Sequence, residues 1–69
     1  MNVNIREYIK NNFKDSNIDE IKESIEASIE SNDEVVLPGL GVLFEILWRE
    51  SEVDTHKEIL NYLKNGMTK

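Results

Sequence analysis

The sequence contains no cysteine, one proline, three glycines and a single histidine among its 69 residues. Without cysteine, the chain can form neither a disulfide nor a thiolate metal site. A single histidine also excludes a metal site built from several histidines of one chain. The composition therefore predicts a fold held together by packing alone, as expected in a reducing compartment.

Long apolar segments are also missing. The longest mostly apolar stretch, residues 35–48, is too short to span a bilayer and contains a proline, two glycines and a glutamate. The first seven residues show no basic region followed by an apolar run, which a signal peptide would have. We therefore expect no membrane partner and a cytosolic location in the broad sense.

Basic residues are scarce: eight lysines and arginines stand against 14 acidic residues, which gives a net charge of −6. Acidic chains are repelled by the phosphate backbones of nucleic acids. Only Arg6, Lys10 and Lys14 have the i, i+4 spacing that places them on one helix face. The charge balance thus disfavours nucleic acid as a partner.

A chain of 69 residues forms one domain, residues 1–69. A core of this size supplies roughly 3–5 kcal/mol of net stability unless something else supports it. The hydrophobic fraction of 39% and the regular apolar patterns argue against disorder over most of the length.

Residues 4–14 have the periodicity of an amphipathic helix, because apolar residues recur at steps of three and four. Asn4 is a suitable N-cap, and Glu7 follows three residues later, as in a capping box. Val3, before the cap, is placed to pack on Tyr8. We predict a helix over residues 4–14.

Residues 18–32 give the clearest helical pattern, with four isoleucines in one stripe. Asn17 or Ser16 can cap this helix, and Asp19 and Glu20 suit the positive end of its dipole. The stripe can pack within the chain or against a partner helix. Its members are Ile18, Ile21, Ile25 and Ile29.

The start of this helix also matches part of a calcium-binding EF-hand loop, Asp15-x-Asn17-x-Asp19 with Glu26 at the twelfth position. The sixth position of such a loop should be glycine but is Glu20, and the isoleucine stripe continues through the supposed loop. We therefore favour a capped helix start and predict neither a metal nor a cofactor.

Residues 55–65 form the last predicted helix, which has one apolar stripe made of Val53, His56, Ile59, Leu60 and Leu63. Thr55 and Glu58 have the spacing of a capping box, and Gly66 is placed to end the helix. His56 lies in its first turn, and no serine or cysteine nucleophile motif accompanies it. We predict a packing or surface role for His56 and no catalytic residue in the chain.

The centre of the chain combines a turn signal with an apolar run. Residues 35–37 favour extended backbone, Pro38-Gly39 is a turn signal, and Gly41 allows a sharp change of direction. Residues 42–50 are apolar on nearly every face, so periodicity alone does not separate helix from strand. We predict a short buried helix there because no partner strand follows.

Together these segments predict an all-α mini-domain, a small bundle of about four short helices around a central Leu-Pro-Gly-Leu-Gly turn. Phe44 and Trp48 are large anchors, worth about 1.5–3 kcal/mol each when buried in a core, or hot spots when they lie at an interface. We expect Phe44 in the core, whereas Trp48 suits either place. The apolar mass exceeds what four short helices easily bury, which predicts self-association. The candidate interaction residues are Leu37, Pro38, Gly39, Leu40, Gly41, Phe44 and Trp48.

The stretch from Leu37 to Trp48, LPGLGVLFEILW, closely resembles the central motif of the small acid-soluble spore protein I family. The similarity covers the whole chain, including MNVNIR at the start and ILNYLKNG at residues 59–66. The resemblance implies a minor protein of the forespore and spore core, with a structural or protein-interaction role in sporulation. It implies no cofactor and no small-molecule substrate, and it leaves the partner open between another protein and a second copy.

Residues 29–46 also resemble the histone-like HU family, in which a helix pair is followed by a strand with a Gly-Leu/Phe-Gly turn. HU-type proteins continue into a long basic β-arm, whereas this chain continues with residues 49–52, Arg-Glu-Ser-Glu. The resemblance makes a DNA-associated protein the alternative. Extended structure over residues 42–50 would favour it.

Overall fold

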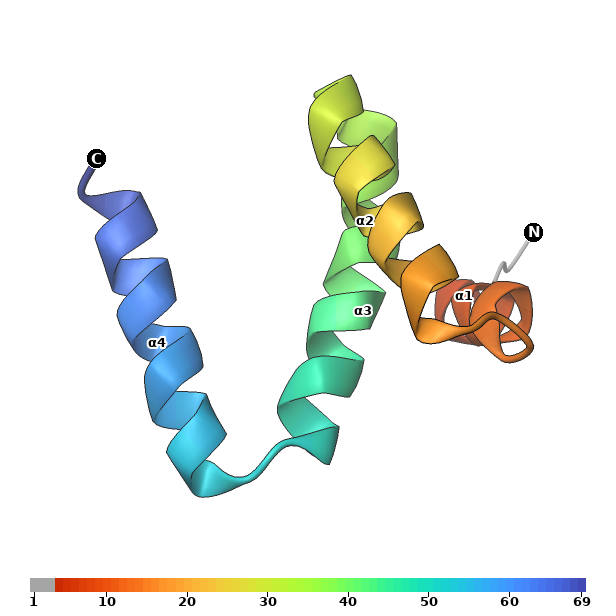
Figure 1. The fold of residues 1–69 in the computed structure, drawn as a ribbon. Helices are drawn as coiled ribbons and strands as arrows, with labels where there is room; N and C mark the ends of the chain where they lie inside the picture. Colours follow the sequence, from red (N-terminus) through yellow and green to blue (C-terminus); the bar gives the residue numbers. More distant parts are fainter. Residues whose placement is uncertain (1–3) are drawn as a thin grey trace.

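In the computed structural model, residues 4–69 are described, and they form four α-helices and one short 3₁₀ helix (Figure 1). No strand occurs within this part of the chain. The predicted all-α fold is confirmed, as is the helical state of residues 42–50. The expectation that this segment is buried is wrong: among residues 42–50, Val42 alone is buried, because the last helix diverges from this one. The elements are α1 (Ile5–Phe13), α2 (Ile18–Ser31), η1 (Glu34–Val36), α3 (Leu37–Glu50) and α4 (Val53–Met67).

The first two helices begin at the predicted caps. The Asn4 side chain accepts a hydrogen bond from the backbone N–H of Glu7 at 3.1 Å. At the start of α2 the capping box is complete: Asn17 Oδ1 accepts from the Glu20 N–H at 2.8 Å, and Glu20 Oε1 accepts from the Asn17 N–H at 3.3 Å. These bonds satisfy backbone donors that a helix start leaves without intrahelical partners.

The isoleucine stripe of α2 is only partly used for packing. Ile21 and Ile25 are half-buried, whereas Ile18 and Ile29, at the two ends of the helix, are 83% and 63% exposed. The predicted packing of Val3 on Tyr8 lies outside the described residues.

The Pro-Gly turn predicted at the centre does not form. Pro38 lies in the first turn of α3, where its missing N–H would have had no intrahelical partner. Gly39 and Gly41 are also helical, and neither has a positive φ. The valines expected to be extended lie in η1, and the backbone leaves α2 through Asn32, which has a left-handed φ of 53°.

The last helix is longer than predicted at both ends. It begins at Val53 after the extended residue Glu52, so Thr55 lies inside the first turn and does not cap it. Gly66 does not stop the helix, which continues to Met67. Because no glycine in the described chain takes a left-handed φ, Gly66 does not supply the left-handed cap that was expected of it.

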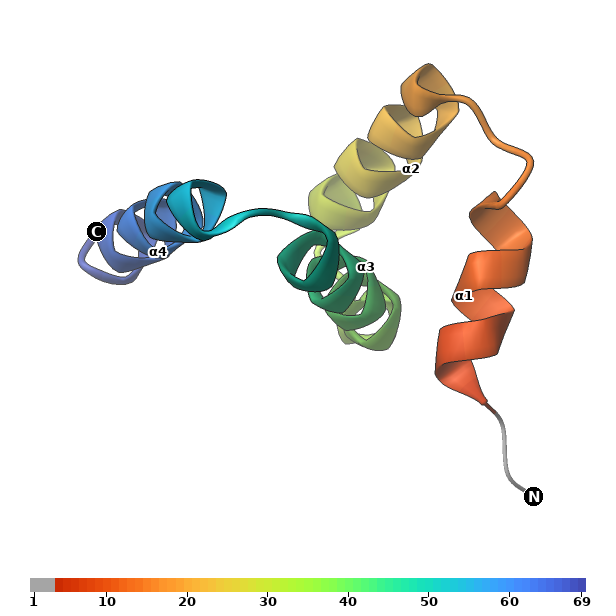
Figure 2. The same ribbon diagram turned by 90° about the horizontal axis from the view of Figure 1, so that it is seen from below.

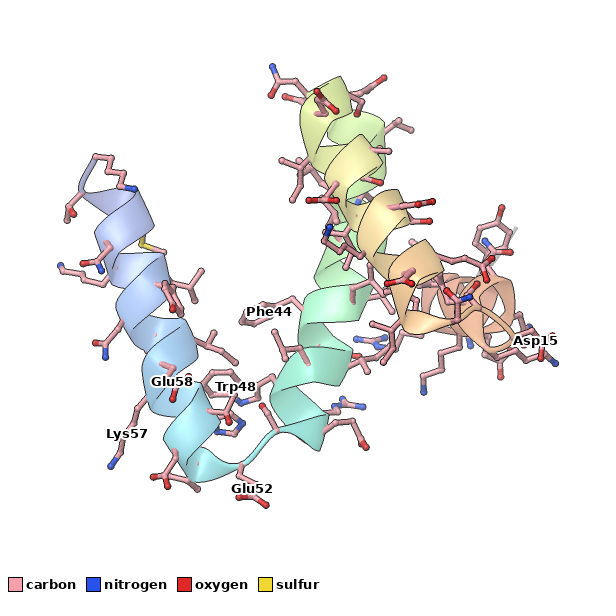
Figure 3. The ribbon with its side chains drawn as sticks, in the orientation of Figure 1. Asp15, Phe44, Trp48, Glu52, Lys57 and Glu58 are labelled. Atoms are coloured by element: carbon pink, nitrogen blue, oxygen red, sulfur yellow. The ribbon has the colours of Figure 1, made fainter. Side chains whose placement is uncertain are left out.

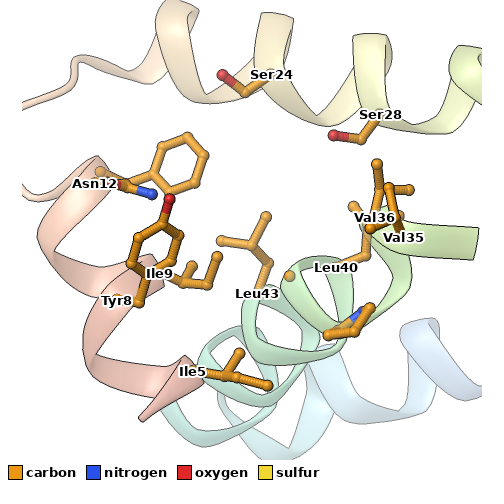
Figure 4. A pocket seen from close by; sticks show the side chains of 13 residues that line it. Ile5, Tyr8, Ile9, Asn12, Ser24, Ser28, Val35, Val36, Leu40 and Leu43 are labelled. Carbon is orange, nitrogen blue, oxygen red and sulfur yellow. The ribbon is translucent and has the colours of Figure 1, made fainter. Parts of the chain in front are cut away.

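Packing is closest between α1 and α3. A Cβ atom built on Gly39 would lie 3.3 Å from Ile9 Cδ1, so this glycine allows α1 to approach α3 closely. Helix α2 packs less tightly: clefts of about 340 Å³ and 750 Å³ lie between it and the α1–α3 pair. Figure 4 shows why, since Ser24 and Ser28 point from α2 into the first cleft in place of larger apolar side chains.

Helix α4 diverges from α3 after the two-residue connection Ser51–Glu52. The separation is visible in both ribbon views (Figures 1 and 2). Consequently α4 makes no extensive packing contact with any other helix. Within residues 4–69, Val42 alone is buried, with 8% of its surface exposed.

Candidate interaction surface

The predicted interaction residues divide between two sides of α3. Gly39 contacts α1, and Leu40 lines the cleft between α1, α2 and α3 (Figure 4). Phe44 and Trp48 instead point toward α4 (Figure 3). Of the second group, Phe44 is 41% exposed and Trp48 is half-buried.

Three further predicted residues lie in the first turns of α3. Leu37 is 58% exposed. Pro38 and Gly41 line a shallow depression beside Ile5 of α1. The sequence motif is therefore continuous along the chain, but the structure does not bring its members to one surface.

Trp48 and His56 form the contact that joins α3 to α4. Their rings stack with centroids 3.9 Å apart and an angle of 4° between the planes. His56 Nε2 lies 2.7 Å from the Trp48 carbonyl oxygen and donates to it when the proton is on Nε2. The Ser51 hydroxyl donates to the same oxygen at 3.3 Å. These contacts satisfy a carbonyl at the end of α3 and give His56 a packing role, one of the two roles predicted for it.

An apolar surface lies exposed beside this contact. On α3, Phe44 is 41% exposed, so the core position expected for it is wrong. Leu47 is 46% exposed and also borders the larger cleft, which Ile21 and Ile25 of α2 line. On α4, Leu60 is 52% and Leu63 is 39% exposed. Leu60 and Leu63 follow His56 by four and seven residues, so they share the face of α4 that His56 turns toward Trp48. We call Phe44, Leu47, Leu60 and Leu63 the α3–α4 surface.

Of the four residues of the α3–α4 surface, only Phe44 was among the interaction residues predicted from the sequence. The apolar stripe of residues 55–65 contained Leu60 and Leu63, but periodicity identifies a face without showing what covers it. The ring of Phe44 stacks on that of Trp48, with centroids 6.1 Å apart, so the surface continues directly into the contact between the two helices.

An ion pair fixes α1 on α3, away from this surface. Arg6 donates through Nε to Glu45 Oε1 at 2.7 Å and through a terminal nitrogen to Oε2 at 2.9 Å. These hydrogen bonds lower the pKa of Glu45, partial burial opposes the shift, and the charge of Arg49 adds to the lowering. The same bonds raise the pKa of Arg6. Because the pair is bidentate, Glu45 holds α1 on α3.

The segment that matched an EF-hand loop is the capped start of α2. Asn17 caps the helix, Asp19 lies in its first turn, and Glu26 lies in its interior. Among residues 4–69, no group of three potential ligands is placed to hold a metal ion. No helix in the same range is long and apolar enough to cross a membrane.

Comparison with known proteins identifies the family. The profile of small, acid-soluble spore protein I matches residues 3–67. The chain is 36% identical over 69 residues to small, acid-soluble spore protein I of Bacillus mycoides (strain KBAB4), and the alignment covers 100% of both chains. The proteins of the same name from Bacillus cereus (strain G9842) and Bacillus anthracis (strain A0248) match with the same identity and coverage. No solved structure matches significantly. The chain belongs to the small, acid-soluble spore protein I family.

Proposed function

We propose that this spore protein works by docking its α3–α4 surface onto another protein surface, without catalysis, in the core of the spore. The observation that carries the proposal is the exposure of four large apolar side chains on two helices that make no extensive packing contact with each other beyond the Trp48–His56 stack. Contiguous exposed apolar side chains mark interaction sites in soluble proteins. Family membership supports the association with spores, and the resemblance described above is the basis for the core location and for synthesis in the forespore.

The positions of the obvious acid–base groups support a non-enzymatic role. The one histidine, His56, is stacked on Trp48 and bonded to its carbonyl oxygen. Glu45, the carboxylate with a shifted pKa, is held by Arg6 in an ion pair. Both groups are thus engaged in contacts that hold helices together.

The DNA-associated alternative depends on the HU resemblance of residues 29–46, in which the strand with the Gly-Leu-Gly turn would fall at residues 35–45. All of these residues lie in η1 and α3. The net charge of −6 also opposes contacts with phosphate. No structural observation favours this alternative, which stays a prediction to be tested.

A titration of labelled duplex DNA with the purified protein, followed by fluorescence anisotropy at low and moderate salt, tests the proposal. We expect no saturable binding even at low salt. Saturable binding that weakens as salt rises would show real phosphate contacts and would overturn the proposal in favour of the HU-like role. In spores stripped of their coats, we expect the protein to stay in the core fraction; its loss with the coats would contradict the location.

A further inference from the structure

We propose that the α3–α4 surface is covered by a second copy of this chain, in a symmetric dimer. The proposal rests on the docking function above and deepens it by naming the partner. In such a dimer, α4 of each copy packs on α3 of the other copy.

The first argument is the amount of exposed surface. The chain exposes 6202 Å², whereas a compact monomer of this mass exposes about 4,450 Å². The excess is about 1,750 Å². A stable interface of standard size takes roughly 800 Å² from each partner. The chain therefore exposes enough additional surface to form one.

The shape of the chain agrees with this estimate. The Cα radius of gyration is 13.4 Å, whereas a compact 69-residue domain has a value of about 11 Å. With Val42 alone buried in residues 4–69, the chain has a large apolar surface and a small core. Small domains of this kind are commonly completed by association.

The second argument is the distribution of charge. Residues 53–69 contain three lysines and two acidic residues, a net charge of +1. Residues 1–52 contain five basic and twelve acidic residues, a net charge of −7. Contact between α4 of one copy and the body of the other therefore joins opposite charges, whereas contact between the two bodies joins like charges. A second copy of the chain therefore offers the negative surface that the positively charged α4 segment complements.

The third argument is the contact at the base of α4. The stack of Trp48 on His56, with the hydrogen bond to the Trp48 carbonyl oxygen, holds α4 at an angle to its own α3. Phe44 therefore remains free to be covered by another helix. Two-fold symmetry forms both α4-on-α3 contacts at once, which places four helices around one shared core.

Sedimentation equilibrium of the full chain, from about 5 to about 500 μM, tests the proposal. We expect a concentration-dependent monomer–dimer equilibrium. Leu60→Glu should raise the dissociation constant by about tenfold or more, because it places a charge in the centre of the interface. Tyr62→Glu is the matched control: it introduces the same charge into the same helix, at a residue that is 77% exposed and off the apolar stripe. It should change the dissociation constant by less than about twofold.

Leu60→Ala weakens the same contact without a new charge and keeps a strong helix former, so it separates loss of the interface from loss of α4. It should also raise the dissociation constant, with helix content unchanged by circular dichroism. A chain that stays monomeric over the whole range overturns the proposal. A dimer that Leu60→Glu leaves intact also overturns the proposal. The same holds for a dimer that Leu60→Glu and Tyr62→Glu weaken equally. Sedimentation tests the dimer and the DNA titration tests the docking function. A monomeric chain that also fails to bind DNA would therefore overturn the dimer and leave the docking function standing.

Discussion

Glu45 links α1 to α3 through two hydrogen bonds from one guanidinium group. The Arg6 side chain is 62% exposed and that of Glu45 is 30% exposed, so solvent screens the pair and its contribution to stability is small. The contribution nonetheless depends on pH, because the pKa of Glu45 in the folded chain lies below its ordinary value of 4.5.

Glu45→Gln should lower the free energy of unfolding at neutral pH, and the deficit should disappear in acid. A lowered folded-state pKa gives stability that is fully present above 4.5 and is lost as the pH falls through the folded-state value. Urea unfolding of the wild type and the variant, at fixed protein concentration and a series of pH values, measures the difference. A difference that stays constant down to pH values well below 4.5 would contradict the role given to this pair.

Contacts between near neighbours in sequence could be predicted, and contacts that depend on where helices end could not. Asn4 and Asn17 cap helices as predicted, because a capping bond involves residues only three apart. The stack of Trp48 on His56 depends on α3 ending at Glu50 and α4 beginning at Val53. Nothing local in the sequence gives that geometry, although the apolar stripe of the last helix did include His56.

Helix α3 shows how one dipeptide can suit two structures. Pro38-Gly39 favours a β-turn, but proline is equally suited to the first turn of a helix. What selects the helix is contact with distant residues: Gly39 lies against Ile9 of α1, and Leu40 faces the cleft shared with α2. The helical state of residues 42–50 could be predicted, and the earlier start of the helix could not, because those contacts are long-range.

Gly41→Ala should stabilise the chain by about 0.5–1 kcal/mol, because a helical glycine costs that much relative to alanine. A Cβ atom there would meet nothing within 4 Å, and the backbone has no positive φ to strain. Thermal unfolding at one fixed protein concentration measures the effect.

Gly39→Ala is the comparison for this prediction. Its Cβ would lie 3.3 Å from Ile9 Cδ1, so the same gain in helix propensity is offset by crowding against α1. We expect a smaller gain than for Gly41→Ala. Destabilisation by Gly41→Ala would contradict a helix running through the Leu-Pro-Gly-Leu-Gly motif.

At the scale of the whole molecule, residues 4–69 form a small all-α fold in which three α-helices associate loosely and the fourth diverges. The helix content could be predicted from periodicity, since apolar residues recur at helical steps in three of the four α-helices. The divergence of α4 could not, because periodicity shows that α4 has an apolar face without showing what covers it. Self-association, expected from the apolar mass alone, acquires a specific surface in the structure, namely Phe44 and Leu47 on α3 with Leu60 and Leu63 on α4.

Isotope-filtered NOE spectroscopy on an equimolar mixture of ¹³C-labelled and unlabelled protein would show which residues meet between copies. We expect intermolecular NOEs between the methyl groups of Leu60 and Leu63 in one copy and the ring of Phe44 in the other. If NOEs between copies are absent at a protein concentration of about 500 μM, or if they connect Ile18 and Ile29 of α2 instead, the α3–α4 surface is not where this protein binds itself.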